Sequence, residues 1–170
     1  MAQYNQLPFF VYGTLLPGQP NYYLWGESII QRQVAALANG RLYDLGNYPM
    51  LLETGDDLVK GMMMTVRPSA YKTVLTRLDY LEGYFPDKPG ESEYARLVRE
   101  VQLEDGTAVT VWVYIGQVNH QLSLPIVPNG DWVTHAAHKQ DNLETWWQHI
   151  NSVAGLHNQA HDTKSPYSSP

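Results

Sequence analysis

The 170-residue sequence contains no cysteine, which excludes disulfides, thiolate metal sites and a cysteine nucleophile together. It has no run of about 18 apolar residues, so we expect no membrane-spanning helix. No basic segment followed by an apolar stretch occurs near its start, so we expect no signal peptide. These absences predict a cytoplasmic protein.

Positive charge is scarce: 11 Lys and Arg face 17 Asp and Glu, for a net charge of −6. After Leu103 the basic residues are Lys139 and Lys164. Nucleic-acid surfaces need a clustered basic patch, so we expect no nucleic-acid partner. Glycine-rich nucleotide motifs and a Gly-x-Ser-x-Gly elbow are missing as well. His135 and His138 lack a third ligand in zincin spacing, and we expect no metal site.

The 44% apolar content is enough for one domain with a real core. We assign that domain to residues 1–155, and the polar residues 156–170 to a disordered tail. Strand patterns dominate the first two thirds, with helices inserted rather than alternating regularly. The expected strands are Phe9–Tyr12, Gln33–Leu45 with a break at Asn39-Gly40, Met50–Leu52, Leu58–Val66, Tyr94–Glu104 and Thr107–Ile115. This order predicts an α+β fold with a small mixed or antiparallel, barrel-like sheet flanked by a few helices.

Two helices are expected. The first opens at Arg67-Pro68-Ser69, carries apolar residues at helical spacing and ends at Gly83. The second covers Asp141–Val153. The three methionines Met62–Met64 are expected to fill the core.

The last two strands are predicted to join through a two-residue turn at Asp105-Gly106. That register places Tyr114 opposite Leu97. Because side chains alternate across a strand, Tyr94 and Arg96 would then face away from Tyr114.

One charge occupies an unusual position. Glu82 lies near the centre of the apolar stripe of the first helix, in its last turn, where the helix dipole disfavours an anion. Desolvation and the dipole both raise a carboxyl pKa, and a raised pKa suits a general base or acid. Two plainer readings stay open: Glu82 swings out at a frayed helix end, or it accepts a buried hydrogen bond.

Two motifs occur together in this chain. Tyr12-Gly13-Thr14-Leu15 ends the first strand, and Leu78-Asp79-Tyr80-Leu81-Glu82-Gly83 ends the helix. With "LYDLGNYPML", "VKGMMMTV", "YARLVREVQLEDG", "VWVYI" and "NGDW" in the same order, this pair resembles the γ-glutamylcyclotransferase-like (AIG2-like) family from Phe9 to Trp132.

The resemblance implies a small β-barrel flanked by helices, and an enzyme that needs no cofactor. Its substrate would be a γ-glutamyl amide, whose α-amine attacks the γ-carbonyl and releases 5-oxoproline and a free amine. A homodimer is the candidate assembly, with the oligomeric state left open. The resemblance assigns the catalytic role to Glu82, and substrate binding to Tyr12, Gly13, Thr14, Leu15 and Tyr94.

Two other classes of function remain open from the sequence. The same pocket could hold an amino-acid-like ligand without turning it over, as a non-catalytic binding module. A structural or interaction protein that uses the tail is the third reading.

Overall fold

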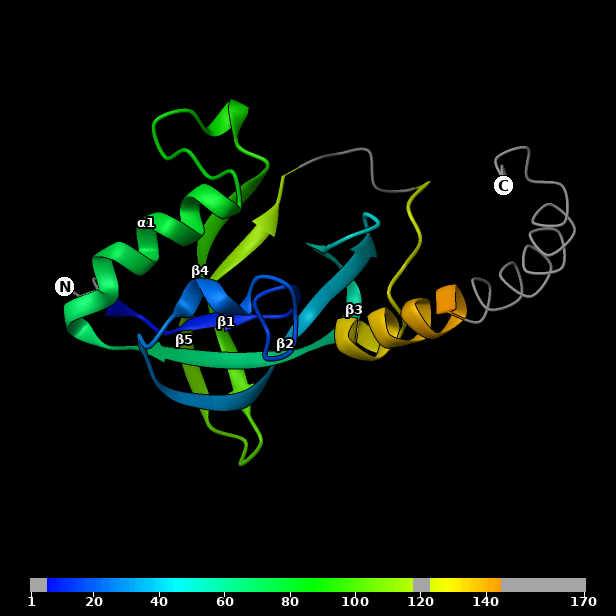
Figure 1. Cartoon of the computed structure of the whole chain (residues 1–170), viewed down its shortest axis with the longest axis horizontal. Helices are drawn as coiled ribbons and strands as arrows, with labels where there is room; N and C mark the ends of the chain where they lie inside the picture. The colour runs from blue at the N-terminus through cyan, green and yellow to red at the C-terminus, as the bar shows by residue number, and fades with distance from the viewer. Residues whose placement is uncertain (1–5, 118–122, 145–170) are drawn as a thin grey trace, which may run out of the picture. The chain divides into compact units, whose positions relative to one another are not determined.

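Five strands close into a barrel in the order β1-β3-β2-β4-β5 (Figure 1). This computed structural model describes residues 6–117 and 123–144. The strands are β1 (Phe9–Val11), β2 (Ile29–Asp44), β3 (Pro49–Val66), β4 (Tyr94–Leu103) and β5 (Ala108–Gly116). Neighbours pair antiparallel except β1 and β5, which meet in parallel at Phe9 and Trp112. The predicted fold class, a mixed barrel with flanking helices, is confirmed.

The central strands β2 and β3 are longer than expected. The expected strands Met50–Leu52 and Leu58–Val66 form one strand, β3, and the residues between them lie inside it as a bulge. Leu52 pairs with Arg41 and Asp57 pairs with Gly40, so residues 53–56 have no partners across the ladder. The predicted break at Asn39-Gly40 lies in β2, opposite this bulge, and Asn39 has a positive φ of 59°. Such bulges bend a strand without ending it.

The hairpin of β4 and β5 corrects the predicted register by one residue. Arg96 lies opposite Tyr114, and Leu97 lies opposite Val113. The loop has three residues, 104–106, rather than two, and Gly106 has a φ of 85°. This is the second common hairpin geometry, in which glycine takes the left-handed position. Tyr114 therefore shares its face of the sheet with Tyr94 and Arg96.

Helix α1 (Tyr71–Leu81) follows a short 3₁₀ turn, η3 (Pro68–Ala70), and ends as the sequence predicts. Gly83 has a φ of 60°. Its N–H donates to the carbonyl of Tyr80 at 3.2 Å, and the Tyr84 N–H donates to the carbonyl of Asp79 at 2.9 Å. These two bonds form a Schellman motif with Gly83 at the left-handed position. Glu82 is consequently the helix C-cap.

The core lies between α1 and the barrel. Tyr71, Val74 and Leu78 of the helix are buried against β1 and the 3₁₀ segment η2 (Tyr22–Trp25). The rings of Phe9 and Trp25 meet edge to face, with their centroids 6.0 Å apart. The methionines contribute to the core as expected, because Met64 and Met63 are buried.

The chain divides into two compact units, Met1–Val133 and Thr134–Pro170. The shorter segments of the first unit are η4 (Pro89–Glu91) and η6 (Pro128–Gly130). Residues 132–144 are helical, so the last helix begins nine residues earlier than predicted. Ala136 and Ala137, strong helix formers, lie in this stretch. Residues 145–153 and the predicted tail 156–170 lie outside the described residues.

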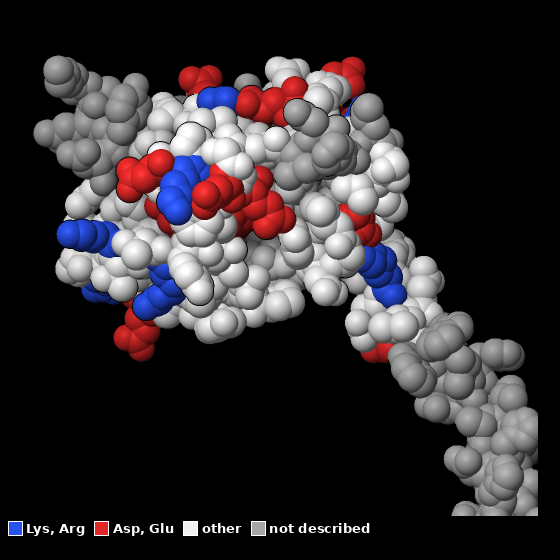
Figure 2. Space-filling view, turned by 90° about the horizontal axis from the view of Figure 1, so that it is seen from above, with Lys and Arg blue, Asp and Glu red and all other residues white. Residues whose placement is uncertain are grey.

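Within the described residues, no helix has the length and apolar character to span a membrane. On the face shown in Figure 2, Lys and Arg side chains are interspersed with Asp and Glu rather than gathered in one patch. The prediction that no nucleic acid binds stays a prediction.

Candidate active site

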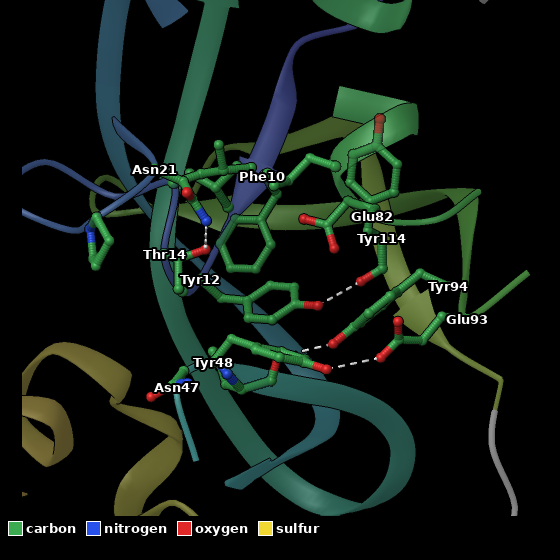
Figure 3. A pocket seen from close by; sticks show the side chains of 16 residues that line it. Phe10, Tyr12, Thr14, Asn21, Asn47, Tyr48, Glu82, Glu93, Tyr94 and Tyr114 are labelled. Atoms are coloured by element: carbon green, nitrogen blue, oxygen red, sulfur yellow. Dashed lines mark hydrogen bonds between the residues drawn. The ribbon is translucent and has the colours of Figure 1, made fainter. Parts of the chain in front are cut away.

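One cavity of about 520 Å³ opens between the end of β1, the end of α1 and the starts of β3 and β4 (Figure 3). The structure brings together on its wall every residue to which the sequence assigns a site role. These are Tyr12, Gly13, Thr14, Leu15, Glu82 and Tyr94.

The first wall is the loop that follows β1. It folds back on itself, because the Leu16 N–H donates to the Gly13 carbonyl at 3.1 Å and the Asn21 N–H donates to the Thr14 carbonyl at 2.9 Å. The Asn21 amide also donates to the Thr14 hydroxyl at 2.9 Å. Among the hydrogen bonds of residues 6–117 and 123–144, none uses the N–H groups of Gly13, Thr14 or Leu15. These donors remain for a ligand.

Gly13 is required by its surroundings rather than by its φ. A Cβ there would lie 2.6 Å from Pro49 Cγ and 2.9 Å from Pro49 Cδ. The proline ring cannot rotate away, so a side chain at this position displaces Pro49 and the Asn47-Tyr48 turn before it. The glycine therefore lets the loop after β1 approach Pro49, at the start of β3, closely.

We expect Gly13→Ala to lower kcat/KM about 10- to 100-fold, because it displaces the loop after β1 relative to Pro49 and so changes the shape of the cavity. Steady-state assays measure the effect. The double variant Gly13→Ala/Pro49→Ala is the control, because it removes the clashing ring atoms and should recover activity over Gly13→Ala alone. Equal activity of the double and single variants would contradict this explanation.

Glu82 forms the facing wall. The Schellman motif fixes its backbone, and its carboxylate points into the cavity between Phe10 and Tyr114 (Figure 3). Burial raises the pKa of Glu82 from 4.5 to about 8, and the negative charge of Glu93 contributes in the same direction. Of the readings left open by the sequence, the structure therefore disagrees with a Glu82 that swings out into solvent.

The other polar groups deep in the cavity are tyrosine hydroxyls held neutral by burial. Burial raises the pKa of Tyr12 and of Tyr94 further above 10. The Tyr12 hydroxyl donates to the carbonyl of Tyr114 at 2.6 Å, and the Tyr94 hydroxyl donates to the carbonyl of Pro49 at 3.2 Å. Their oxygens keep lone pairs that can accept from an ammonium group.

A charged network fixes the end of α1 against the barrel. Arg96 forms an ion pair with Asp79, with 2.9 Å between Nε and Oδ1, and the Tyr114 hydroxyl donates to the same oxygen at 2.7 Å. The Arg96 guanidinium also stacks 4.3 Å from the centroid of Trp112. Asp79 precedes Glu82 by less than one turn, so this network helps to position the carboxylate.

Sequence reasoning missed several residues of the cavity. Tyr114 lines it, in contrast to the prediction, because the three-residue hairpin loop turns it to the same face as Tyr94. The sequence Glu104-Asp105-Gly106, with glycine third, is the pattern that could have shown this. Asn47 and Tyr48 form part of the rim, together with Glu93, the last residue of the loop 85–93 that the sequence places on the amine side of the substrate. Their positions depend on long-range contacts that no local pattern reports.

The raised pKa of Glu82 also predicts how stability depends on pH. Below about 4.5 the carboxyl is protonated in both the folded and the unfolded state. Between 4.5 and about 8 the unfolded chain releases this proton while the folded protein retains it, so the free energy of unfolding falls as pH rises. Glu82→Gln should remove this dependence.

The expected result is a melting temperature for Glu82→Gln that exceeds that of the wild type by a margin growing from pH 4.5 to pH 8. Thermal unfolding at several pH values measures the margin. A constant margin across this range would contradict the raised pKa.

Comparisons with known proteins agree with this geometry. Residues 9–134 match the model of the family described as gamma-glutamyl cyclotransferase, AIG2-like. A protein of Vibrio cholerae whose name assigns it as a γ-glutamylcyclotransferase is 37% identical over 123 residues, which cover 72% of this chain and 92% of that protein. The gamma-L-glutamyl-butirosin B gamma-glutamyl cyclotransferase of Niallia circulans is 35% identical, over 62% of this chain and 64% of its own.

A solved structure shares the fold as well. The crystal structure of an AIG2-like protein from Mus musculus superposes with a TM-score of 0.56 at 28% identity. The match covers 74% of this chain and 88% of the mouse protein.

Proposed function

This chain belongs to the gamma-glutamyl cyclotransferase, AIG2-like family and is an enzyme of that type, and we propose that it cleaves a γ-glutamyl amide by internal attack. The substrate's α-amine attacks its own γ-carbonyl, and the products are 5-oxoproline and a free amine. The observation that supports this most is the carboxyl of Glu82, with a pKa of about 8, aimed into a cavity opposite unused backbone donors.

Glu82 acts as the proton carrier of this reaction. The α-ammonium group has to lose a proton before the nitrogen can attack, and a carboxylate whose pKa is raised to about 8 is a much stronger base for this step than an ordinary carboxylate. The attacking nitrogen gives up two protons on the way to the lactam, and the leaving nitrogen gains two. Glu82 transfers them in sequence from one nitrogen to the other, so it ends in its starting state.

The cavity supplies the geometry for ring closure. Amine and carbonyl belong to one molecule, so the protein has to fold the glutamyl chain until they meet, which is catalysis by proximity. The hydroxyl oxygens of Tyr12 and Tyr94 are suited to accept from the α-ammonium. The N–H groups of Gly13, Thr14 and Leu15 are suited to receive the α-carboxylate or the oxyanion that develops on the γ-carbonyl.

The test is a product assay with the purified chain. A panel of γ-glutamyl dipeptides and γ-glutamylamines is incubated with the protein, and 5-oxoproline and free amine are quantified by mass spectrometry. We expect the two products in equal amounts from at least one substrate. The proposal fails if no member of a broad panel gives 5-oxoproline.

The same assay separates the enzyme from the non-catalytic binding module considered at the outset, which no finding favours. A binding module would raise its melting temperature with a ligand that is recovered unchanged. The cytoplasmic setting, the absence of a cofactor and the homodimer stay predictions.

A further inference from the structure

The rim of the cavity carries charge of one sign. The carboxylic acids among the described lining residues are Glu82, which is partly buried, and Glu93, which is exposed at the mouth. Lysine, arginine and histidine are not among the lining residues that the structure describes. In the described part of the lining, no cationic side chain compensates a negative charge on a ligand.

Glu93 is held in place at this mouth. Its N–H donates to the carbonyl of Gly83 at 3.1 Å, and its own carbonyl accepts from the N–H of Gln117 at 3.1 Å. Its carboxylate accepts a hydrogen bond from the Tyr48 hydroxyl at 3.0 Å (Figure 3). Both sides of the residue are thus fixed, and the carboxylate stays beside the opening.

Among the residues that the structure describes, no cation neutralises the charge of Glu93. The ion pairs found within residues 6–117 and 123–144 do not include it. Lys88, a cation of the same loop, pairs with Glu91 at 3.5 Å instead. An uncompensated carboxylate at an opening attracts cations and repels anions.

The orientation of the substrate decides which of its charges Glu93 meets. Glu82 has to reach the α-amine, so the glutamyl head lies inside, between the loop 12–15 and the end of α1. The amine side of the scissile bond then points to the rim, where Asn47, Tyr48 and Glu93 lie. The charge of the leaving group therefore interacts with the carboxylate of Glu93.

We propose that Glu93, together with Tyr48, makes the enzyme selective for leaving amines that carry a further positive charge. The substrate class is a γ-glutamylated aliphatic diamine or polyamine rather than a γ-glutamyl amino acid, whose leaving group carries a carboxylate. The inference rests on the proposed function, because it assumes that the glutamyl head reacts at Glu82. The ring of Tyr48 adds an aromatic face against which an alkylammonium group can pack through a cation–π interaction.

Three matched substrates test this selectivity. Each joins the γ-carboxyl of glutamate to a four-carbon chain, which ends in an ammonium group, a methyl group or a carboxylate. We expect kcat/KM for 5-oxoproline release to fall in that order, with about a tenfold difference between the cationic and the anionic substrate. This magnitude corresponds to the attraction of the cationic substrate to an exposed carboxylate and to a repulsion of similar size for the anionic substrate.

Glu93→Gln should reduce the ratio of cationic to anionic kcat/KM to within about twofold, and Glu93→Lys should invert it. Glu91→Gln is the matched control, because it removes a carboxylate from the same loop without changing the lining of the cavity. Its ratio should equal that of the wild type. Circular dichroism checks that each variant is folded.

The ratio separates a contact with the leaving group from an effect through Glu82. The negative charge of Glu93 raises the pKa of Glu82, so its removal changes the rate with all three substrates by a common factor. A common factor leaves the ratio unchanged. An unchanged ratio in Glu93→Gln, or a wild type that prefers the anionic substrate, overturns the proposal.

Failure of the proposed function looks different. In that case the wild type would release no 5-oxoproline from any member of the broad panel, the three matched substrates included. Turnover elsewhere in the panel without turnover of the three matched substrates would overturn the selectivity alone. Equal turnover of all three would overturn the selectivity alone and leave the proposed function standing.

Discussion

Glu82→Gln is expected to lower kcat/KM for 5-oxoproline release by about 10²- to 10⁴-fold, the range that one general acid-base group contributes. Glutamine has nearly the same shape as glutamate but cannot take a proton from the α-ammonium. The substrate should still enter the cavity, because the loop donors and the tyrosine hydroxyls are unchanged. The loss should therefore appear mainly in kcat rather than in KM.

The matched control for this change is Glu100→Gln, the same chemical substitution at an exposed position of β4. It should retain full activity. Product release is followed by mass spectrometry with both variants at the same enzyme concentration. Full activity of Glu82→Gln would reject Glu82 as the proton carrier even if the chain proves to be a cyclotransferase.

Gly61→Ala is expected to have the largest effect on stability, with a loss of about 3 kcal/mol or more. Gly61 lies in β3, where β1 crosses closely, next to the pair of Met62 and Val11. A Cβ at this position would overlap the carbonyl oxygen of Val11 and lie 2.8 Å from the ring of Phe10. A backbone oxygen in a paired strand cannot move aside, so the pairing of β1 with β3 has to give way.

This loss corresponds to a decrease in melting temperature of roughly 10 °C for a chain of this size. Calorimetry or urea unfolding measures it directly. Gly90→Ala is the control, because a Cβ there meets no atom within 4 Å and the φ of Gly90 is not positive. Its stability should stay within about 0.5 kcal/mol of the wild type. A Gly61→Ala variant as stable as Gly90→Ala would contradict the close approach of β1.

The parts of the site that local patterns control could be predicted from the sequence. The helical spacing of apolar residues and the glycine that closes the Schellman motif place Glu82 at the end of α1. The end of β1 is also local, because the aromatic run stops at Gly13.

The rest depends on contacts between segments far apart in the sequence. Tyr114 reaches the cavity through a hairpin register that changes with one loop residue. Glu93 comes beside Glu82 through the backbone bond from its N–H to the Gly83 carbonyl. Tyr48 faces Glu93 because the barrel closes, with β1 paired to β5, and no local pattern reports that closure.

The source of the oxygen in the product tests the central claim most directly. The reaction is run in H₂¹⁸O with a substrate that the enzyme turns over, and the masses of the products are measured by mass spectrometry. Attack by the substrate's own amine consumes no water, so we predict 5-oxoproline without ¹⁸O and free amine in equal amount. Glutamate that carries one ¹⁸O would show that water is the nucleophile and would contradict the account.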